Sequence, residues 1–370
     1  PDFSYRECYA PAPSRIPIRR IGRFAGKPWN LSVHEAEVLK VGIIGLGVGE
    51  AHIPGYAQHP DCMLSALCDR DSEKLNAVAE HHPAVRLYNH ADDLLSDPEI
   101  NIVSIASYDE DHFEQVCRAI SAGKHVFVEK PLCQSAEELV EIRRLLSANP
   151  SIRLSSNLIM RAYPRFTALR SAIADGEFGE LYFLEGDYNY GRLSKLLDGW
   201  RGKQAFYSIV LGGGVHIVDL LMWLADDRIV EVSAVGNTIC SAGSGFGNKD
   251  MVVATLKFER GIVGKLAVNF GCVMPHFHRV SVYGTEATFE NRPDAGLQYT
   301  SREPSAVPAK IELPYPGVEK HGLIPSFVAS ILNGETALVD EKSVFDCMAV
   351  CFGIERAVTE ARIVKIEYDY

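Results

Sequence analysis

The first part of the chain alternates short apolar runs with stretches of helical periodicity. Continuous apolar runs are typical of strands buried on both faces of a sheet. Because such strands alternate with helices over short connections, we predict a doubly wound parallel sheet. Strands are expected at residues 41–46, 63–68, 102–106, 125–128 and 152–155, and helices at 72–81, 112–122 and 135–147.

Beyond residue 156 the pattern changes to longer strands in which apolar and polar residues alternate. Glu259-Arg260-Gly261 between two of them predicts a tight hairpin. Such a pattern is typical of a large, mostly antiparallel open sheet with helices on one face, an α+β domain. The strands are expected at 182–190, 230–237, 251–258, 262–270 and 279–289, and helices at 216–224 and 345–361.

The whole chain is therefore expected to be an α/β protein in three parts. We predict an N-terminal arm at residues 1–39, a dinucleotide-binding domain at 40–156 and an α+β domain at 157–370. The arm is rich in proline, arginine and scattered apolar residues. It is either a disordered terminus or a strap that lies on a neighbouring subunit.

Composition and charge narrow the class of partner. The 370 residues carry a formal net charge of −11, which argues against nucleic acid as a ligand. We expect no membrane span, no secretion signal and a small-molecule partner. The nine cysteines are scattered without a Cys-x-x-Cys pair, which fits a reducing cytoplasm.

A glycine-rich turn follows the first predicted strand and opens a helix. Gly45 permits a sharp turn, and Gly47 and Val48 bring the backbone close to a pyrophosphate. A strict Gly-x-Gly-x-x-Gly pattern would require glycine at position 50, where Glu50 stands. We expect Gly49 to provide the close packing one position early.

An acidic residue closes the second predicted strand. Asp69 stands where a carboxylate bonds the adenosine ribose hydroxyls and repels a 2′-phosphate, which favours NAD over NADP. The adjacent Arg70 could stack on adenine or tolerate the 2′-phosphate, which leaves NADP open. The motif therefore predicts a cofactor, NAD, at this edge of the sheet.

Glu129-Lys130-Pro131 directly follows the strand at 125–128, at the carboxyl edge where open α/β sheets bind ligands. On this nucleotide-binding half, the motif resembles the Gfo/Idh/MocA family, which includes glucose–fructose oxidoreductase and inositol dehydrogenase. The similarity extends from about residue 40 to the C-terminus. It includes the segment 106–112, in which Ser107 and His112 match the family pattern while Tyr108 and Asp109 depart from it.

The resemblance implies roles for these residues. Ser107 and His112 are expected to contact the nicotinamide side of the cofactor. Glu129 and Lys130 are also expected to bind the cofactor, Glu129 by positioning the lysine or the ribose. The second domain is expected to bind substrate and to pack against another subunit, in a homodimer or homotetramer.

The family also has an Asp-x-x-x-His segment in its second domain. Here His216 takes the histidine position, while Gly212 replaces the aspartate. Asp219, one helical turn beyond His216, either substitutes for that carboxylate or braces the helix.

Oxidation of a secondary alcohol requires a hydride acceptor and a base. We predict that Lys130 polarises or deprotonates the reacting hydroxyl, with His216 as proton shuttle. Lys130, His216, Arg161, Arg201 and Asp219 are expected to contact a sugar, inositol or sugar derivative. His276 and His278 are expected at the rim of the site or on the sheet surface, and no metal is expected.

Three functions remain open from the sequence. The first is an NAD-dependent oxidoreductase acting on a carbohydrate hydroxyl. The second is a redox-neutral NAD-dependent lyase or glycosidase, and the third is a non-catalytic dinucleotide-binding regulator. The replacement of the family aspartate by Gly212 keeps the third reading open.

Overall fold

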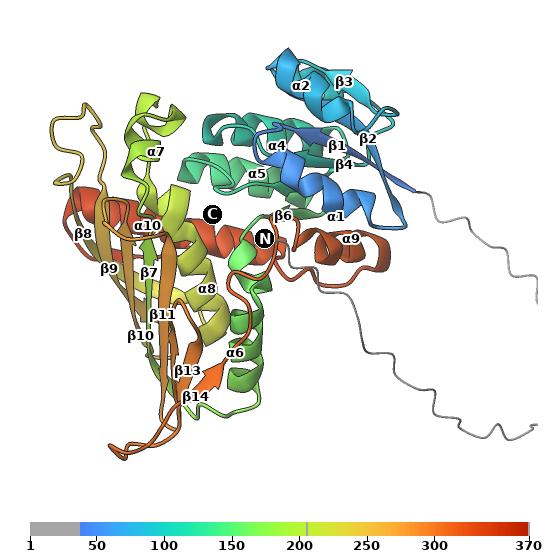
Figure 1. Cartoon of the computed structure of the whole chain (residues 1–370). Helices are drawn as coiled ribbons and strands as arrows, with labels where there is room; N and C mark the ends of the chain where they lie inside the picture. Colours follow the sequence, from blue (N-terminus) through green and yellow to red (C-terminus); the bar gives the residue numbers. More distant parts are fainter. Residues whose placement is uncertain (1–37, 205, 369–370) are drawn as a thin grey trace, which may run out of the picture. The chain divides into compact units, whose positions relative to one another are not determined.

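The structure is a computed structural model that describes residues 38–204 and 206–368 (Figure 1). From Val38 onward the chain forms one compact unit. All of the predicted N-terminal arm except its last two residues lies outside the described residues, so the strap hypothesis stays a prediction.

The first half contains a six-stranded sheet in the order β3-β2-β1-β4-β5-β6. Every neighbouring pair of these strands is parallel, which confirms the predicted doubly wound sheet. The strands are β1 (Leu39–Ile44), β2 (Cys62–Cys68), β3 (Arg86–Tyr88), β4 (Ile102–Ile105), β5 (His125–Val128) and β6 (Leu154–Ser156). The connecting helices are α1 (Ile53–Ala57), α2 (Ser72–Ala79), α3 (Ala91–Leu95), α4 (His112–Ser121) and α5 (Ala136–Ala148).

The order of the strands in the six-stranded sheet determines where a ligand can bind. The chain runs outward through β2 and β3 from β1, and then crosses back to β4 on the other side of β1. At such a switch point the loops after the two central strands diverge and leave a crevice. The loops after β1 and β4 therefore border a ligand site.

The second half contains a nine-stranded sheet in the order β14-β13-β12-β11-β7-β10-β9-β8-β15. β7 and β10 pair in parallel and the other described pairs are antiparallel, as the mostly antiparallel prediction requires. The strands are β7 (Leu181–Asn189), β8 (Ile229–Asn237), β9 (Met251–Phe258), β10 (Val263–Asn269), β11 (Phe277–Gly284), β12 (Thr288–Asn291), β13 (Gly296–Tyr299), β14 (Ala309–Ile311) and β15 (Val364–Lys365).

One strand prediction is wrong. The single strand expected at 279–289 is two antiparallel strands, β11 and β12, joined by a tight turn. The turn is closed by a 2.8 Å hydrogen bond from the Gly284 amide to the Ala287 carbonyl. The apolar residues on both sides of the turn hid this break in the sequence pattern.

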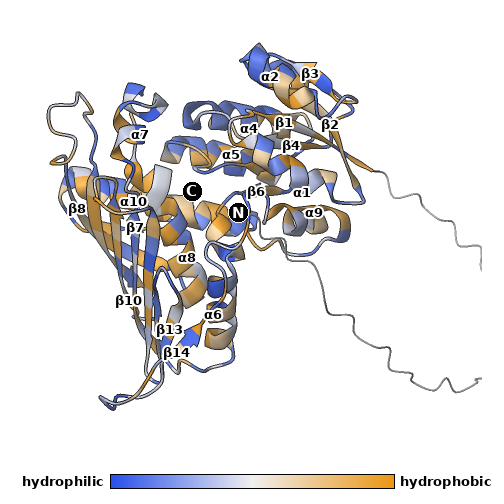
Figure 2. Ribbon diagram, in the orientation of Figure 1, coloured by the Kyte–Doolittle hydropathy of each residue, from blue (hydrophilic) through white to orange (hydrophobic). Residues whose placement is uncertain are grey.

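Helices cover one side of this sheet, as Figure 1 shows for α6 and α8. Figure 2 shows apolar residues running through the strands of the sheet. A Cβ atom at Gly186 of β7 would lie 2.3 Å from Cγ2 of Ile217, so glycine allows α8 to approach the sheet closely. The helices are α6 (Pro164–Ala174), α7 (Leu193–Leu197), α8 (Val215–Ala225), α9 (Ile324–Asn333) and α10 (Glu341–Glu360).

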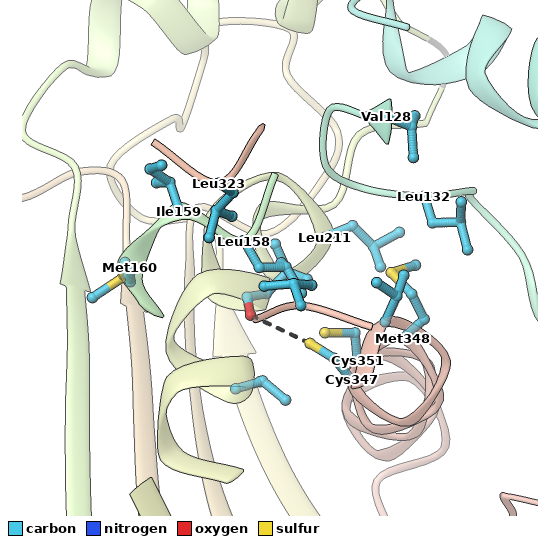
Figure 3. Packing of buried hydrophobic residues seen from close by; sticks show 14 of the residues in the cluster. Val128, Leu132, Leu158, Ile159, Met160, Leu211, Leu323, Cys347, Met348 and Cys351 are labelled. Carbon is cyan, nitrogen blue, oxygen red and sulfur yellow. Dashed lines mark hydrogen bonds between the residues drawn. The ribbon is translucent and has the colours of Figure 1, made fainter. Parts of the chain in front are cut away.

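Both halves contribute to one apolar core (Figure 3). Val128 and Leu132 come from the segment around the end of β5, and Cys347 and Cys351 come from α10. Cys347 donates a 3.4 Å hydrogen bond from its Sγ to the Val215 carbonyl at the start of α8. The end of β5 and the start of α8, which carry Lys130 and His216, therefore rest on the same packed interior.

Candidate active site

Two adjoining pockets share Lys130 and Arg201 in their walls. The outer pocket, about 470 Å³, lies at the carboxyl ends of β1 and β4 and includes Gly45, Gly47, Asp69 and Ser107. The inner pocket is about 320 Å³. It is lined by Lys130, Ile159, Met160, Tyr163, Tyr188, Tyr190, Arg192, Arg201, Tyr207, Gly212, His216, Phe270, His276, His278 and Lys320.

The turn after β1 has the geometry of a backbone cradle. Gly45 has a φ of +84°, and a Cβ there would lie 2.4 Å from the Ala106 carbonyl oxygen, so only glycine fits. A Cβ at Gly47 would find nothing nearer than Lys74 Nζ at 3.9 Å, so its backbone is open to the pocket. At Gly49 a Cβ would lie 2.8 Å from Ile43 Cγ2, which is the close packing that the sequence predicted for this position.

Asp69 stands at the end of β2 and supports this cradle. Its Oδ2 accepts a 2.8 Å hydrogen bond from the Leu46 amide, and its Oδ1 accepts one of 2.9 Å from the Asp71 amide. Each carboxylate oxygen keeps a second acceptor site for a ligand hydroxyl. Arg70 forms an ion pair with Asp111, so its charge is already partnered at the edge of the outer pocket.

His112 fastens the loop after β4 to the loop after β5. Its Nδ1 lies 2.7 Å from the Pro131 carbonyl oxygen, and its Nε2 lies 3.3 Å from the Ser107 carbonyl oxygen. Ser107 Oγ donates a 2.8 Å hydrogen bond to Gln115. Both predicted residues line the outer pocket, and the ring of His112 holds the backbone beside Lys130.

Glu129 is buried within a network that the sequence did not reveal. Its Oε1 accepts hydrogen bonds from Asn157 Nδ2 at 2.8 Å and from His52 Nε2 at 3.3 Å. Burial opposes ionisation, yet the His52 hydrogen bond and the charges of Lys320 and Lys130 hold the pKa of Glu129 well below its ordinary value. Glu129 is therefore a fixed negative charge beneath Lys130.

Lys130 lies where the two pockets meet. Its Nζ donates a 2.9 Å hydrogen bond to the carbonyl oxygen of Gly212, in a π-helical segment (Val210–Gly214) that precedes α8. The peptide bond between Lys130 and Pro131 is cis. Burial lowers the pKa of Lys130, and it stays lowered although Asp109 and Glu129 act against that shift.

His216 lines the inner pocket from the first turn of α8. Its ring stacks on Tyr188 with centroids 6.2 Å apart, and its buried Nδ1 has no hydrogen-bond partner among the described residues. Burial, together with the charges of Lys130 and Lys320, holds the pKa of His216 well below its ordinary value. The ring is therefore neutral and keeps an unused nitrogen.

Arg161 and Asp219 are brought together by the structure, but outside both pockets. Arg161 Nη2 lies 2.6 Å from Asp219 Oδ1, and Arg161 Nη1 donates a 2.9 Å hydrogen bond to the Leu338 carbonyl. Both side chains are almost fully buried. The expected contact of these two residues with substrate does not match this placement, because each is engaged by the other.

Several residues of the inner pocket were absent from the sequence-based site. Tyr188, Tyr190 and Tyr207 form much of its wall, and Arg192 and Lys320 add positive charge. Tyr188, Tyr190 and Arg192 come from the end of β7 and the residues directly after it, whereas Tyr207 and Lys320 come from two other segments, and no local motif marks them. Arg201 and His216, in the wall beside Lys130, were predicted as substrate contacts.

His276 and His278 also face the inner pocket. His276 Nδ1 lies 3.0 Å from the Asn189 carbonyl oxygen, and His278 Nδ1 lies 2.6 Å from Tyr315 Oη. Burial lowers the pKa of His278 to about 3. Within residues 38–204 and 206–368, no group of three or more His, Cys, Asp or Glu side chains is arranged to hold a metal ion.

Two family models match the chain. Residues 39–156 match an oxidoreductase family with an NAD-binding Rossmann fold, and residues 166–290 match the GFO/IDH/MocA C-terminal domain. The first matched segment contains all six strands of the parallel sheet, and the second contains β7 to β11 and most of β12 of the nine-stranded sheet.

Individual proteins show the same similarity. An uncharacterised oxidoreductase of Synechocystis is 31% identical over 193 residues, which cover 50% of this chain and 51% of that protein. Myo-inositol 2-dehydrogenase of Thermotoga maritima is 22% identical over 89% of this chain and 99% of its own. A crystal structure of scyllo-inositol dehydrogenase from Lactobacillus casei, with bound NAD(H) and scyllo-inositol, shares the fold. Its TM-score is 0.73 at 17% identity, and the match covers 89% of this chain and 99% of that one.

Proposed function

Since the chain belongs to the Gfo/Idh/MocA family of NAD-binding oxidoreductases, we propose that it oxidises a hydroxyl group of a sugar, inositol or sugar derivative. The observation that carries this proposal is the position of Lys130. Its amine lies in the wall common to the two pockets and is fixed by the Gly212 carbonyl. A base in that wall can reach a substrate hydroxyl in the inner pocket beside a cofactor in the outer one.

The outer pocket fits NAD. The open backbone at Gly47 admits a pyrophosphate, and the free acceptor sites of Asp69 suit ribose hydroxyls. NAD bound there would supply the hydride acceptor. The carboxylate of Asp69 disfavours a 2′-phosphate, and Arg70 is already paired with Asp111, so we assign NAD rather than NADP. The holding residues are Gly45, Gly47, Val48, Gly49, Asp69, Arg70, Ser107, His112, Glu129 and Lys130.

Lys130 is proposed as the base. Its lowered pKa increases the fraction of neutral amine near working pH, and a neutral amine can accept the hydroxyl proton. The Gly212 carbonyl orients the amine, and the negative charge of Glu129 stabilises the ammonium that forms.

His216 is proposed to pass that proton onward. Its ring lines the inner pocket and is neutral, so one ring nitrogen can take up a proton as the other releases one. Arg201, held by a 3.0 Å hydrogen bond from its Nε to Tyr207 Oη, is proposed to contact substrate oxygens. Arg161 and Asp219 are instead assigned to bracing α8.

We propose a homo-oligomer in the cytoplasm from the exposed face of the second sheet and from the cysteines. The side of the nine-stranded sheet away from α8 exposes Tyr182, Val235 and Val263, which suits packing against a second copy in a homodimer or homotetramer. The eight cysteines in the described residues are unpaired, which favours a reducing compartment such as the cytoplasm. No helix in this part of the chain is long and apolar enough to cross a membrane.

The proposal is tested by following absorbance at 340 nm with NAD⁺ or NADP⁺ across polyols, aldoses, sugar acids and sugar phosphates. We expect NADH to form with members of this panel. Conversion of a sugar without net NADH would instead indicate a redox-neutral lyase or glycosidase. Tight NAD binding with no conversion at all would indicate a regulator.

A further inference from the structure

The inner pocket has an uneven charge balance. Four cationic side chains line it, those of Lys130, Arg192, Arg201 and Lys320, and no aspartate or glutamate is among its lining residues. The chain as a whole carries a net charge of −11. A single-sign cluster on a protein of the opposite net charge indicates a charged ligand.

The four cations lack carboxylate partners at ion-pair distance within the described part of the chain. Lys130 Nζ contacts the Gly212 carbonyl and Arg201 Nε contacts Tyr207 Oη, both uncharged acceptors. Arg161 and Arg228, which lie outside the pocket, are by contrast paired with Asp219 and Asp346. Glu129 and Asp109 act on Lys130 from outside the inner pocket, but none of the four cations of the inner pocket forms a salt bridge within the described residues.

Local contacts hold these cations in place. The Arg192 guanidinium lies over the Tyr190 ring at 5.5 Å, and the Arg201 guanidinium lies over the Trp200 ring at 4.6 Å. The carbonyl of Lys320 accepts a 3.0 Å hydrogen bond from Asn157, a residue of the Glu129 network. Stacking leaves the N–H groups of a guanidinium free, in the planar fork that fits a carboxylate or phosphate.

The cofactor phosphates do not account for all of this charge. Lys130 and Arg201 line both pockets, but Arg192 and Lys320 line the inner pocket alone. Both are exposed to solvent, so a charged group of a ligand can reach them from the open side of the inner pocket. Lys320 also lies near enough to Glu129 and Lys130 to change their pKa values. These two charges are therefore available to a ligand group other than the cofactor phosphates.

We infer that the substrate is a monosaccharide-sized polyol bearing an oxyanion, a carboxylate or a phosphate, which Arg192 and Lys320 bind while Lys130 faces the reacting hydroxyl. This inference rests on the proposed function and narrows its substrate class. A pocket of about 320 Å³ is at the small end of ligand sites, which suits one sugar ring. The rings of Tyr188 and Phe270 offer faces for the C–H surface of that ring.

The test compares matched neutral and anionic compounds. D-glucose is compared with D-glucuronate and D-glucose 6-phosphate, and myo-inositol with myo-inositol 1-phosphate. Turnover is measured as NADH formation, and binding to the NADH-loaded enzyme is measured by calorimetry. We expect at least one anionic compound to bind at least tenfold more tightly than its neutral counterpart. Comparison of the carboxylate compound with the phosphate compounds then identifies which oxyanion the pocket binds.

Variants assign the effect to the two exposed cations. Arg192→Gln and Lys320→Met should each weaken binding of the preferred anion by about tenfold, the scale of one lost charged hydrogen bond. Arg192→Lys should restore part of the loss, and NADH affinity should stay unchanged. Arg144→Gln removes an equally charged arginine from the exposed face of α5 and should have no effect.

The two proposals fail in different ways. Neutral compounds that are oxidised as well as or better than their anionic counterparts would overturn the oxyanion inference and leave the oxidoreductase proposal standing. Anions that bind through Arg192 and Lys320 without any NADH formation would support the binding site and overturn the proposed reaction. Variants that bind both kinds of compound like the wild type would overturn the assignment to these two residues.

Discussion

A Cβ atom at Gly212 would lie 2.1 Å from the hydroxyl oxygen of Tyr207. The tyrosine hydroxyl therefore occupies the space of any side chain at this position. The family pattern has an aspartate there, and in this chain such a side chain would displace Tyr207 and its hydrogen bond from Arg201. Glycine at position 212 and tyrosine at position 207 therefore fit together sterically.

The first prediction concerns this pair. Gly212→Asp should lower the free energy of unfolding by about 1–3 kcal/mol, the usual cost of overpacking, and should reduce turnover because the Gly212 carbonyl orients Lys130. Thermal unfolding and kcat measure the two effects.

A second substitution tests the cause. Tyr207→Ala combined with Gly212→Asp should regain stability, whereas Tyr207→Phe should not, because Tyr207 Cζ itself lies 2.7 Å from the Cβ position. Gly212→Asp that is as stable and active as the wild type, with Tyr207 intact, would show that the collision is absent.

The buried pair of Arg161 and Asp219 is expected to be structural. Asp219→Asn leaves the Arg161 charge buried without a counterion, so we expect a loss of about 3–5 kcal/mol in urea unfolding. Asp226→Asn is the matched control, since Asp226 pairs with Arg170 at an exposed position and should cost less than about 1 kcal/mol. Lost activity at unchanged stability would instead place Asp219 in the substrate site.

Cofactor preference should depend on Asp69. Asp69→Ala should weaken NAD binding relative to NADP by about tenfold or more, because it removes both the ribose acceptor and the charge that repels a 2′-phosphate. Calorimetry with both cofactors measures the ratio. Glu73→Ala removes an acidic residue from the first turn of α2, outside the pocket, and should leave the ratio unchanged. An unaltered ratio in Asp69→Ala would make the NAD assignment wrong.

The pH dependence of kcat/KM should report Lys130. A base acts in its neutral form, so kcat/KM should rise as pH rises through a pKa that lies below the ordinary 10.5. The charge of Lys320 lowers the pKa of Lys130 and that of Asp109 raises it. Lys320→Met should therefore move the rise to higher pH, and Asp109→Asn should move it to lower pH.

Lys310→Met, on the exposed strand β14, provides the control for that experiment and should leave the profile in place. If the pH profile shifts in the opposite directions, or does not shift in either Lys320→Met or Asp109→Asn, a group other than Lys130 titrates.

Much of the fold could be predicted because the two sheets have strands of different pattern. The parallel strands are continuous apolar runs, and the strands of the second sheet alternate apolar and polar residues. The strands at His125–Val128 and Met251–Phe258 have the bounds that the apolar patterns predicted. β3 and α9 were missed, because a three-residue strand and a helix after a long irregular segment leave little periodic signal.

The residues of the site could be predicted only where a short motif next to a predicted strand marks them. Lys130 and the glycine turn were found because each directly follows a buried strand. Arg161 was assigned to substrate because its partner lies 58 positions away and cannot be seen from neighbouring residues. Arg192 and Lys320 come from separate loops and share a wall only after folding.

The most direct test of the account is the rate of NADH formation by Lys130→Met, measured with the best substrate of the panel. We predict that kcat falls by about 1,000-fold, the scale of a lost general base, while calorimetry shows NAD binding within a few-fold of the wild type. Lys195→Met, an exposed change on α7, should retain full activity. Lys130→Met that forms NADH at a rate close to that of the wild type would contradict the central claim that this amine performs the proton transfer.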